Sequence, residues 1–426
     1  MGPGEQTQLW GKTVLKVGLR VIGADEWIGG LYYIHNLVRA LRTLPGNEQP
    51  EIVLAFQAGT ERKHYEEIEP LVELLPYASS KVSSVAPSLT HRAKQLLKHN
   101  RLILSLATSA RQFLGGNPYR ALEQALSNAH VSLVFPCTDS MGTDFRVPWL
   151  AWAWDFQHKH YPDFFSRYEC QRRDQTFARL ATDARLIVTS SNNALADFDR
   201  FFPGQNHKLR VLHFTTVAMP AWYERDVAQT CRKFDLPARY LMLPNQFWVH
   251  KNHRVAFEAI KILIERGLDV NLVCTGGTAD YRHPGHFEQL CNYIKTHDLG
   301  DRIRILGLIP RYDQIQVMRG AMAVVQPSLF EGWSTVVEDA RALGKRQFLS
   351  DIQVHVEQNP PNGVYFSPHS PEALARVIET AWDTLSPGPC LSDEQAALAA
   401  QDKLVTAYAR TFLRIAQELV DMTDGV

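Results

Sequence analysis

Residues 321–346 have the pattern of a strand, a tight loop and a helix in immediate succession, and this segment most restricts the folds open to the chain. Residues 321–326 form a short apolar run rich in β-branched side chains, which is typical of a strand buried on both faces. Thr335 and, three positions later, Glu338 match a capping box, and Gly344 ends the predicted helix in a favoured way. The helix therefore directs its N-terminus at the loop.

The loop before this helix predicts an anion site with a carboxylate on either side. A helix N-terminus offers free amides and the positive end of the helix dipole, and the small residues Gly332, Ser334 and Thr335 leave room for a phosphate. Glu331 lies in the loop, and Asp339 lies eight positions later on the first helical turns. Two carboxylates around an anion site suit a ligand with a central diphosphate and hydroxyl groups at both ends, which is a nucleotide sugar.

The segment SLFEGWSTVVEDARALGK resembles the Glu-x7-Glu segment of the retaining, GT-B-type glycosyltransferases of the large family 4, with Asp339 replacing the second Glu. The resemblance covers nearly the whole chain and is strongest in its second half. It implies that Glu331 holds hydroxyl groups of the donor sugar and that Asp339 holds the ribose. Glu338 is assigned to the capping box instead. The donor-binding loop then also includes Trp333, Ser334 and Thr335.

A glycine pair is the first candidate site in the amino-terminal half. Residues 14–23 are expected to form the first strand of a parallel sheet, and Gly29 and Gly30 follow it where an amphipathic helix begins. Glycines at a helix start allow the backbone to approach a ligand closely. Relatives carry a Gly-Gly loop here that faces the donor diphosphate, so both glycines are assigned to donor binding.

The loop after the predicted strand at residues 149–154 supplies the other catalytic candidates. Asp155, His158 and His160 follow the end of a parallel strand, where α/β sheets place ligand contacts. Many relatives have a histidine and an aspartate in this loop. Trp154 stands at the histidine position and Asp155 at the position of the acid, so His158 is the candidate substitute.

The loop after a predicted strand at residues 240–243 is expected to bind the diphosphate. Relatives have an arginine here and, five positions later, a lysine. Gln246 stands at the arginine position and Lys251 at the lysine position, with His250 and Asn252 as further candidates for this role. By the same resemblance, Leu308 is expected beside the nucleobase.

Composition excludes several classes of protein. Apolar residues make up 45% and charged residues 21% of the chain, as in soluble globular proteins. There are 45 basic and 45 acidic residues, so a general attraction for nucleic acid is not indicated. The six cysteines form no CxxC pair, which favours a reducing cytoplasm and argues against a zinc site. Neither a signal peptide nor a membrane-spanning run of about 18 apolar residues is expected. Asp197 and Asp199 are interpreted as surface charges rather than metal ligands.

Residues 89–113 are helical in pattern and carry basic residues without an acidic one. Two interpretations stay open, namely a solvated helix and a helix that lies on a membrane containing anionic lipids. The second would bring the protein to the inner face of the membrane and favour a lipid-linked acceptor. The basic residues are Arg92, Lys94, Lys98, Arg101 and Arg111.

Together these patterns predict an α/β protein with the GT-B fold, in which two doubly wound Rossmann-like domains face each other across a cleft. The expected divisions are 13–218 for the acceptor-side domain, 219–392 for the nucleotide-sugar domain, and 393–426 for a helix that packs back on the first domain. The expected function is metal-independent transfer of a sugar, with retention, from a UDP- or GDP-sugar to a glycan or lipid-linked acceptor, with no cofactor. Two alternatives are a nucleotide-sugar epimerase and a catalytically inactive binding subunit.

Overall fold

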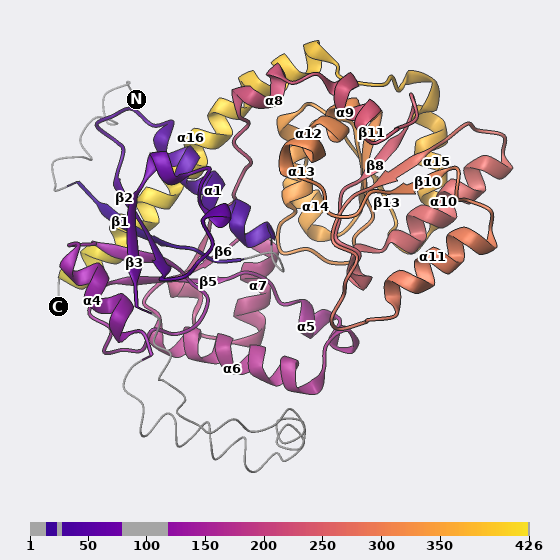
Figure 1. Ribbon diagram of the computed structural model, residues 1–426. Coiled ribbons are helices and arrows are strands. Elements are labelled where there is room, and N and C mark those ends of the chain that lie inside the picture. Colours follow the sequence, from indigo (N-terminus) through magenta and orange to yellow (C-terminus); the bar gives the residue numbers. More distant parts are fainter. Residues whose placement is uncertain (1–13, 24–27, 79–117, 425–426) are drawn as a thin grey trace, which may run out of the picture.

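The computed structural model describes residues 14–23, 28–78 and 118–424, which form two parallel β-sheets with helices on their faces (Figure 1). The first sheet has seven strands in the order β3-β2-β1-β4-β5-β6-β7. These strands are β1 (Lys16–Arg20), β2 (Glu51–Gln57), β3 (Glu73–Tyr77), β4 (Leu133–Cys137), β5 (Trp149–Ala153), β6 (Ile187–Thr189) and β7 (Leu209–Val211). Their helices are α1 (Ile28–Arg42), α4 (Arg120–Asn128), α5 (Gln157–His160), α6 (Arg167–Asp183) and α7 (Asn192–Phe201).

The second sheet has six strands in the order β10-β9-β8-β11-β12-β13. These strands are β8 (Leu241–Leu243), β9 (Leu272–Cys274), β10 (Ile303–Ile305), β11 (Ala323–Gln326), β12 (Gln347–Ser350) and β13 (Gly363–Phe366). The helices are α8 (Pro220–Glu224), α9 (Val227–Lys233), α10 (His253–Glu265), α11 (His286–Thr296), α12 (Arg311–Gly320), α13 (Thr335–Ala342), α14 (Gln353–Gln358), α15 (Pro371–Ala381) and α16 (Leu391–Asp424). The described 3-10 helices are η1 (Arg62–His64), η2 (Glu69–Leu71), η3 (Pro162–Phe164), η4 (Asn206–Lys208), η5 (Val249–Lys251) and η6 (Trp382–Thr384).

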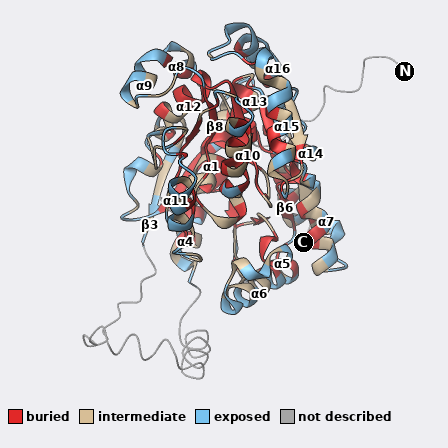
Figure 2. Ribbon diagram, turned by 90° about the vertical axis from the view of Figure 1, so that its right-hand side faces the viewer, coloured by how far each residue is buried: buried red, intermediate tan, exposed pale blue. Residues whose placement is uncertain are grey.

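The central strands of both sheets are apolar along their length because helices cover both faces of each sheet. Every residue of β4, β5, β8 and β11 is buried. Figure 2 shows these buried strands in red, with the exposed faces of the helices outside them. The prediction of an α/β protein with two doubly wound sheets is confirmed.

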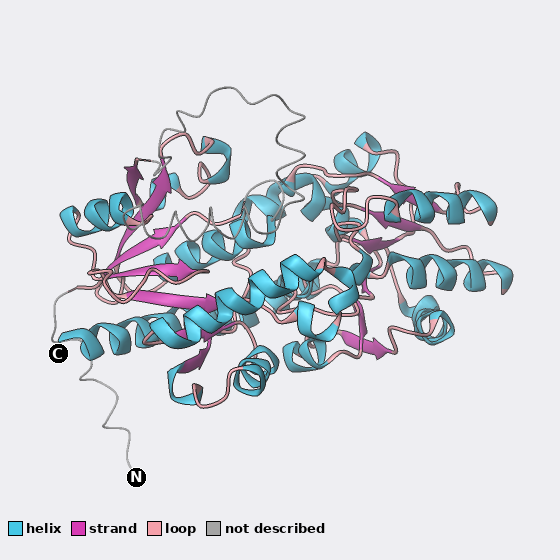
Figure 3. Cartoon of the chain, turned by 90° about the horizontal axis from the view of Figure 1, so that it is seen from below, coloured by secondary structure: helices cyan, strands magenta, loops and turns pink. Residues whose placement is uncertain are grey.

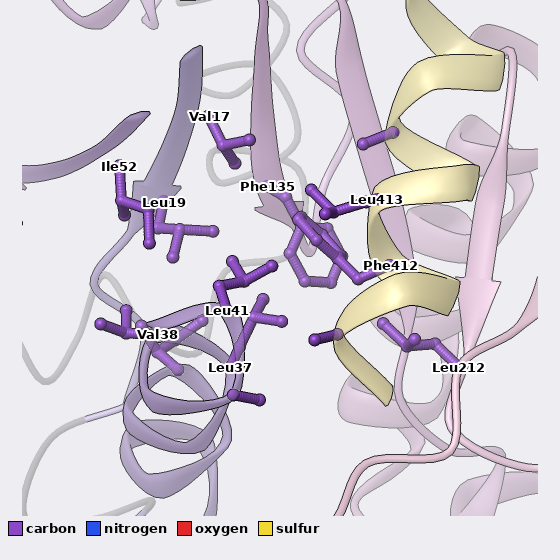
Figure 4. Packing of buried hydrophobic residues seen from close by; sticks show 14 of the residues in the cluster. Val17, Leu19, Leu37, Val38, Leu41, Ile52, Phe135, Leu212, Phe412 and Leu413 are labelled. Atoms are coloured by element: carbon purple, nitrogen blue, oxygen red, sulfur yellow. The ribbon is translucent and has the colours of Figure 1, made fainter. Parts of the chain in front are cut away.

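The core of the first sheet joins residues from opposite ends of the chain. Leu37 and Leu41 of α1 point into this core, and Phe412 of α16 reaches it from the other side (Figure 4). The ring centroids of Phe412 and Phe135 of β4 lie 5.4 Å apart. The carboxy-terminal helix is therefore part of the core of the first sheet.

Helix α16 spans both sheets over 34 residues. Near its start Glu394 forms a buried ion pair with Arg319 of α12, with Oε1 and Nε 2.7 Å apart. Further along, Tyr408, Phe412 and Ile415 are buried in the core of the first sheet. Figure 3, a view from below, shows the helix running from the C-terminal end beside the first sheet toward the second. The domain boundaries drawn from the sequence stay predictions.

Three details differ from the expected elements. Helix α1 begins at Ile28, so Gly29 and Gly30 belong to its first turn and not to a loop. The elements that were not predicted include β3, β13, α4, α6, α12 and α14. Residues 89–113, the segment considered for membrane contact, lie outside the described residues. None of the described helices is long and apolar enough to cross a membrane.

Candidate active site

A cleft of about 490 Å³ lies between the carboxyl ends of the two sheets. From the first sheet its walls include the first turn of α1, the loop after β5 and the start of the loop after β6. From the second sheet they include the loops after β8, β9, β10 and β11. In open α/β sheets ligands bind outside the carboxyl ends of the strands, so this cleft is the candidate active site.

Glu331 and Lys251 meet at one wall of this cleft. Both residues line it, and Lys251 Nζ lies 2.5 Å from Oε1 of Glu331. The same carboxylate oxygen accepts hydrogen bonds from Ser328 Oγ at 2.7 Å and from Gln326 Nε2 at 3.0 Å. Three donors on one oxygen fix the carboxylate of Glu331, which is only 9% exposed. The structure thus brings together two residues that lie 80 positions apart.

The start of α13 differs from the predicted capping box. Ser334 is the N-cap residue, and its Oγ accepts from the amide of Val337 at 3.5 Å. The amide of Ser334 itself donates to Gln358 Oε1 at 3.2 Å. Ser334 is buried and is not among the described residues that line the cleft, whereas Thr335 is. The capping-box prediction is therefore wrong, and the amide of Ser334 is already bound within the protein.

Glu338 does not cap α13. Its carboxylate is buried, accepting from Thr215 Oγ1 at 3.1 Å and from Gln358 Nε2 at 2.9 Å. Arg341 Nε lies 3.3 Å from the same carboxylate. Burial raises the pKa of Glu338. The residue fastens α13 to the chain that follows β7, which the sequence did not indicate.

Asp339 lines the cleft, but protein groups bind both of its carboxylate oxygens. Arg311 donates to Oδ1 at 2.6 Å and to Oδ2 at 2.7 Å, and Thr216 Oγ1 donates to Oδ1 at 2.7 Å. The Arg311 guanidinium also lies over the Tyr32 ring, 4.6 Å from its centroid. Such a bidentate pair is strong and well oriented. A contact of Asp339 with ribose stays a prediction, and Arg311 is a cleft residue that the sequence analysis missed.

Asp155 and His158 have different positions. Asp155 lines the cleft and accepts hydrogen bonds from Arg173 Nη2 and from the Gln157 amide. His158 is buried and is not among the described residues lining the cleft. Its Nδ1 accepts from Arg173 Nε at 3.1 Å, so its Nε2 donates to Asp174 Oδ1 at 2.9 Å. His158 thus accepts a hydrogen bond from Arg173 and does not face the cleft, which argues against the predicted contact of His158 with the donor.

His160 and Asp197 form a pair at the edge of α7. Their Nε2 and Oδ2 atoms lie 2.7 Å apart, and Asp197 is buried. The interpretation of Asp197 as a surface charge is therefore wrong.

Most of the remaining residues predicted to bind the donor line the cleft. Gly29 lines the cleft, whereas Gly30 is buried and is not among the described residues that line it. Gln246 and Leu308 also line it, and Leu308 is 62% exposed. Trp333 lines the cleft while its Nε1 donates to the carbonyl of Phe214 at 2.9 Å.

The two sheets touch at the cleft through Gly332. A Cβ atom on Gly332 would overlap the carbonyl oxygen of Trp154 and stand 3.1 Å from the Cβ of Asp155. Nearby, Tyr161 Oη donates to the carbonyl of Leu329 at 3.2 Å. Glycine is thus required here for contact with the opposite wall rather than for the approach of a ligand alone.

Glu357 links the two sheets beside Trp333. It lies on α14, where its carboxylate accepts from the amides of Asn192 and Asn193 at 2.7 and 3.2 Å. His213 Nε2 lies 2.6 Å from the same carboxylate. The ring of His213 stacks on Trp333, with centroids 4.6 Å apart. A side chain of the second half therefore binds the N-terminus of α7.

Residues 233–384 match the family model described as glycosyl transferases group 1. The similarity to this family therefore covers the part of the chain that contains the second sheet. The matched residues include Lys251, Glu331 and Asp339. The comparison with curated protein sequences gave no match.

Solved structures show that the chain as a whole has a GT-B fold. Anabaena Alr3699/HepE in complex with UDP and glucose is 12% identical with a TM-score of 0.60, and the match covers 97% of this chain and 100% of that one. The sucrose-phosphate synthase from Thermosynechococcus elongatus is 15% identical with a TM-score of 0.61, covering 96% and 98%. A glycosyltransferase from Rickettsia africae is 15% identical with a TM-score of 0.60, covering 96% and 99%. The predicted GT-B fold is confirmed.

Four cations line the cleft, and each is paired with a carboxylate. Two pairs are Lys251 with Glu331 and Arg311 with Asp339. The others are Arg173 with Asp155 and Arg282 with Asp280. Among the described residues, no group of three or more His, Cys, Asp or Glu could hold a metal ion. The cationic side chains of the cleft are thus paired with carboxylates in the part of the chain that is described.

Proposed function

We propose that this protein is a glycosyltransferase that moves a sugar from a nucleotide sugar to a hydroxyl group of an acceptor, with retention and without a metal ion. The observation that carries the proposal is the contact of Lys251 with Glu331 in the cleft, beside the start of α13. A cation suits the leaving diphosphate, and a carboxylate suits the hydroxyl groups of the sugar. The group 1 match supports the same reaction class.

In the proposed reaction the bond between the anomeric carbon and the diphosphate oxygen breaks, and its electron pair leaves on the diphosphate. The acceptor oxygen bonds to the same carbon, and its proton passes to the leaving group. The protein mainly supplies electrostatic stabilisation of the charge that develops on the diphosphate. Lys251 faces that charge, while Glu331 orients the sugar. Retention is proposed because residues 331–339 resemble the Glu-x7-Glu segment of retaining enzymes.

The cations of the cleft support a reaction without metal. Arg173, Arg282 and Arg311 line it together with Lys251. A diphosphate that enters can exchange hydrogen bonds with these side chains, which would otherwise be the task of a divalent ion. Gly29 at the first turn of α1 is proposed to approach the diphosphate from the opposite wall.

The proposed donor is a UDP- or GDP-sugar. Alr3699/HepE has been solved with UDP and with UDP-glucose, which supports a nucleotide-sugar ligand for the shared fold. The proposed acceptor is a glycan or a lipid-linked glycan in the cytoplasm, with peripheral contact to the membrane through residues 89–113. Sedimentation with anionic and neutral vesicles tests that contact, and equal recovery in both supernatants would refute it.

Incubation with UDP-, GDP-, ADP- and dTDP-sugars in the absence of an acceptor tests the proposed reaction. Slow hydrolysis to free nucleoside diphosphate would support the transferase. Release of an epimerised sugar would instead identify an epimerase, and intact binding without either product would identify an inactive binding subunit. NMR of the transferred product then tests retention.

A further inference from the structure

His250 is a buried residue of the cleft to which the reaction above gives no role. It lies on η5 between Trp248 and Lys251, lines the cleft and is 6% exposed. Its backbone carbonyl accepts from the amide of Leu329 at 2.8 Å, which fixes η5 to the loop that carries Glu331. Its Nδ1 is buried without a hydrogen-bond partner among the described residues. A buried polar atom without a partner is costly, so this one requires an explanation.

Cationic and basic groups surround the His250 ring on several elements. Burial and the nearby charges of Lys251 and Arg282 hold the pKa of His250 well below its usual value, with smaller effects from His253 and Arg173. The imidazole is consequently neutral at neutral pH. The carboxylates near these cations are Glu331, Asp280 and Asp155.

The charge balance of the cleft shows why a neutral base at this position matters. Each of the four cations that line it is paired with a carboxylate, so each can donate hydrogen bonds to a diphosphate but shares its charge with that carboxylate. His250 is the one histidine among the described residues that line the cleft. It can therefore gain a positive charge there simply by taking up a proton.

We propose that His250 binds the diphosphate of the nucleotide sugar in its protonated form, and that the protein takes up this proton when the donor binds. The inference rests on the proposed function because it takes a nucleotide sugar as the ligand. A nearby diphosphate reverses the electrostatic reason for which the ring is neutral, since an opposite charge within about 4–6 Å favours the charged form. In the protonated ring both nitrogens carry a hydrogen and can act as donors.

Calorimetry in two buffers with different ionisation enthalpies measures the proton directly. The probes are UDP-, GDP- and ADP-hexoses, whose diphosphate diesters carry no proton at neutral pH, so any uptake belongs to the protein. We expect uptake of roughly half to one proton per donor bound, with affinity rising at most about tenfold per unit as the pH falls from 8 to 6. Equal enthalpies in both buffers for the unmodified protein would overturn the proposal.

Variants assign the proton to one residue. His250→Gln and His250→Asn should remove the uptake and the pH dependence of affinity, while His207→Gln, an exposed histidine outside the cleft, should keep both. Uptake that persists in a folded His250 variant would exclude this residue. If no nucleotide sugar binds the unmodified protein, the proposed function fails together with this inference, whereas binding without proton uptake contradicts the inference alone.

Discussion

Replacing Gly332 with alanine should force the two walls of the cleft apart at the site itself. The new Cβ atom would stand closer to the Trp154 carbonyl oxygen than the 3.0 Å that real Cβ atoms keep. The overlap to be relieved is about 0.7 Å, the difference between 3.0 Å and the distance at which the atom would stand. Backbone atoms hold both sides of this contact, so the walls must move rather than one side chain. A misplacement of about 1 Å costs roughly a hundredfold in rate, so we expect turnover to fall roughly 30- to 100-fold.

Steady-state kinetics and nucleotide binding together test this expectation. Gly332 is not in the left-handed region of backbone conformation, so alanine should alter the contact between the walls without straining the loop. Affinity for the nucleoside diphosphate should change little, because most of the residues proposed to contact the diphosphate belong to the loops of the second sheet. Gly277→Ala is the matched control, since a Cβ there meets nothing within 4 Å. Unchanged turnover in Gly332→Ala would show that the contact with Trp154 is not needed for the reaction.

The structure supports four further predictions. Lys251→Ala and Glu331→Gln should each lower turnover at least roughly a hundredfold, and near-normal kinetics in either variant would remove that residue from the reaction. Glu338→Ala should lower the free energy of unfolding by roughly 3 kcal/mol, because its buried donors lose their acceptor, and a thermal transition unchanged from the unmodified protein would contradict this. Activity should survive EDTA, given the four cations that line the cleft, and an absolute need for added manganese or magnesium would refute the metal-free mechanism. Hydrogen bonds from His35 and Arg39 lower the pKa of Glu67 from 4.5 to about 2. The stability that the Glu67 carboxylate adds is therefore complete above about pH 4.5 and is lost as the pH falls toward 2. Urea titrations at several pH values measure the free energy of unfolding. Below about pH 4.5 it should fall less steeply with pH for Glu67→Gln than for the unmodified protein, and equal slopes would refute this reasoning.

The strands were predictable because parallel strands buried on both faces leave continuous apolar runs. The strands predicted at residues 149–154, 240–243 and 321–326 contain β5, β8 and β11. β13 (Gly363–Phe366) was not predicted because three of its four residues are only partly buried, so the segment lacks a continuous apolar run. Local pattern was also ambiguous at α13, where Ser334 and Thr335 are both acceptable N-caps and only the observed contacts separate them.

The cleft residues that the sequence analysis did not identify show how far the strand-end rule can be applied to a single sequence. Arg282 and Arg311 follow β9 and β10, so the rule that ligands meet the carboxyl ends of strands could have identified both. Arg173 lies within α6, where its sequence position gives no sign that it reaches Asp155. His158 met the strand-end rule, yet it points away from the cleft, because α5 turns its ring toward Arg173 and Asp174. Position along a strand places the backbone, but the rotation of the following helix decides which side chains face a ligand.

Helix α16 makes the first sheet dependent on the last part of the chain during synthesis. The strands of that sheet are complete at Val211, whereas the residues of α16 that enter its core begin at Val405, about 200 residues later. A ribosome adding roughly 5–20 residues per second needs about 10–40 s to cover this interval. Until then the apolar surface that Phe412 and Ile415 will cover is open to water and to other chains. The amino-terminal half therefore cannot finish folding as it emerges, and its final packing has to wait for a helix that is made about 200 residues after its last strand.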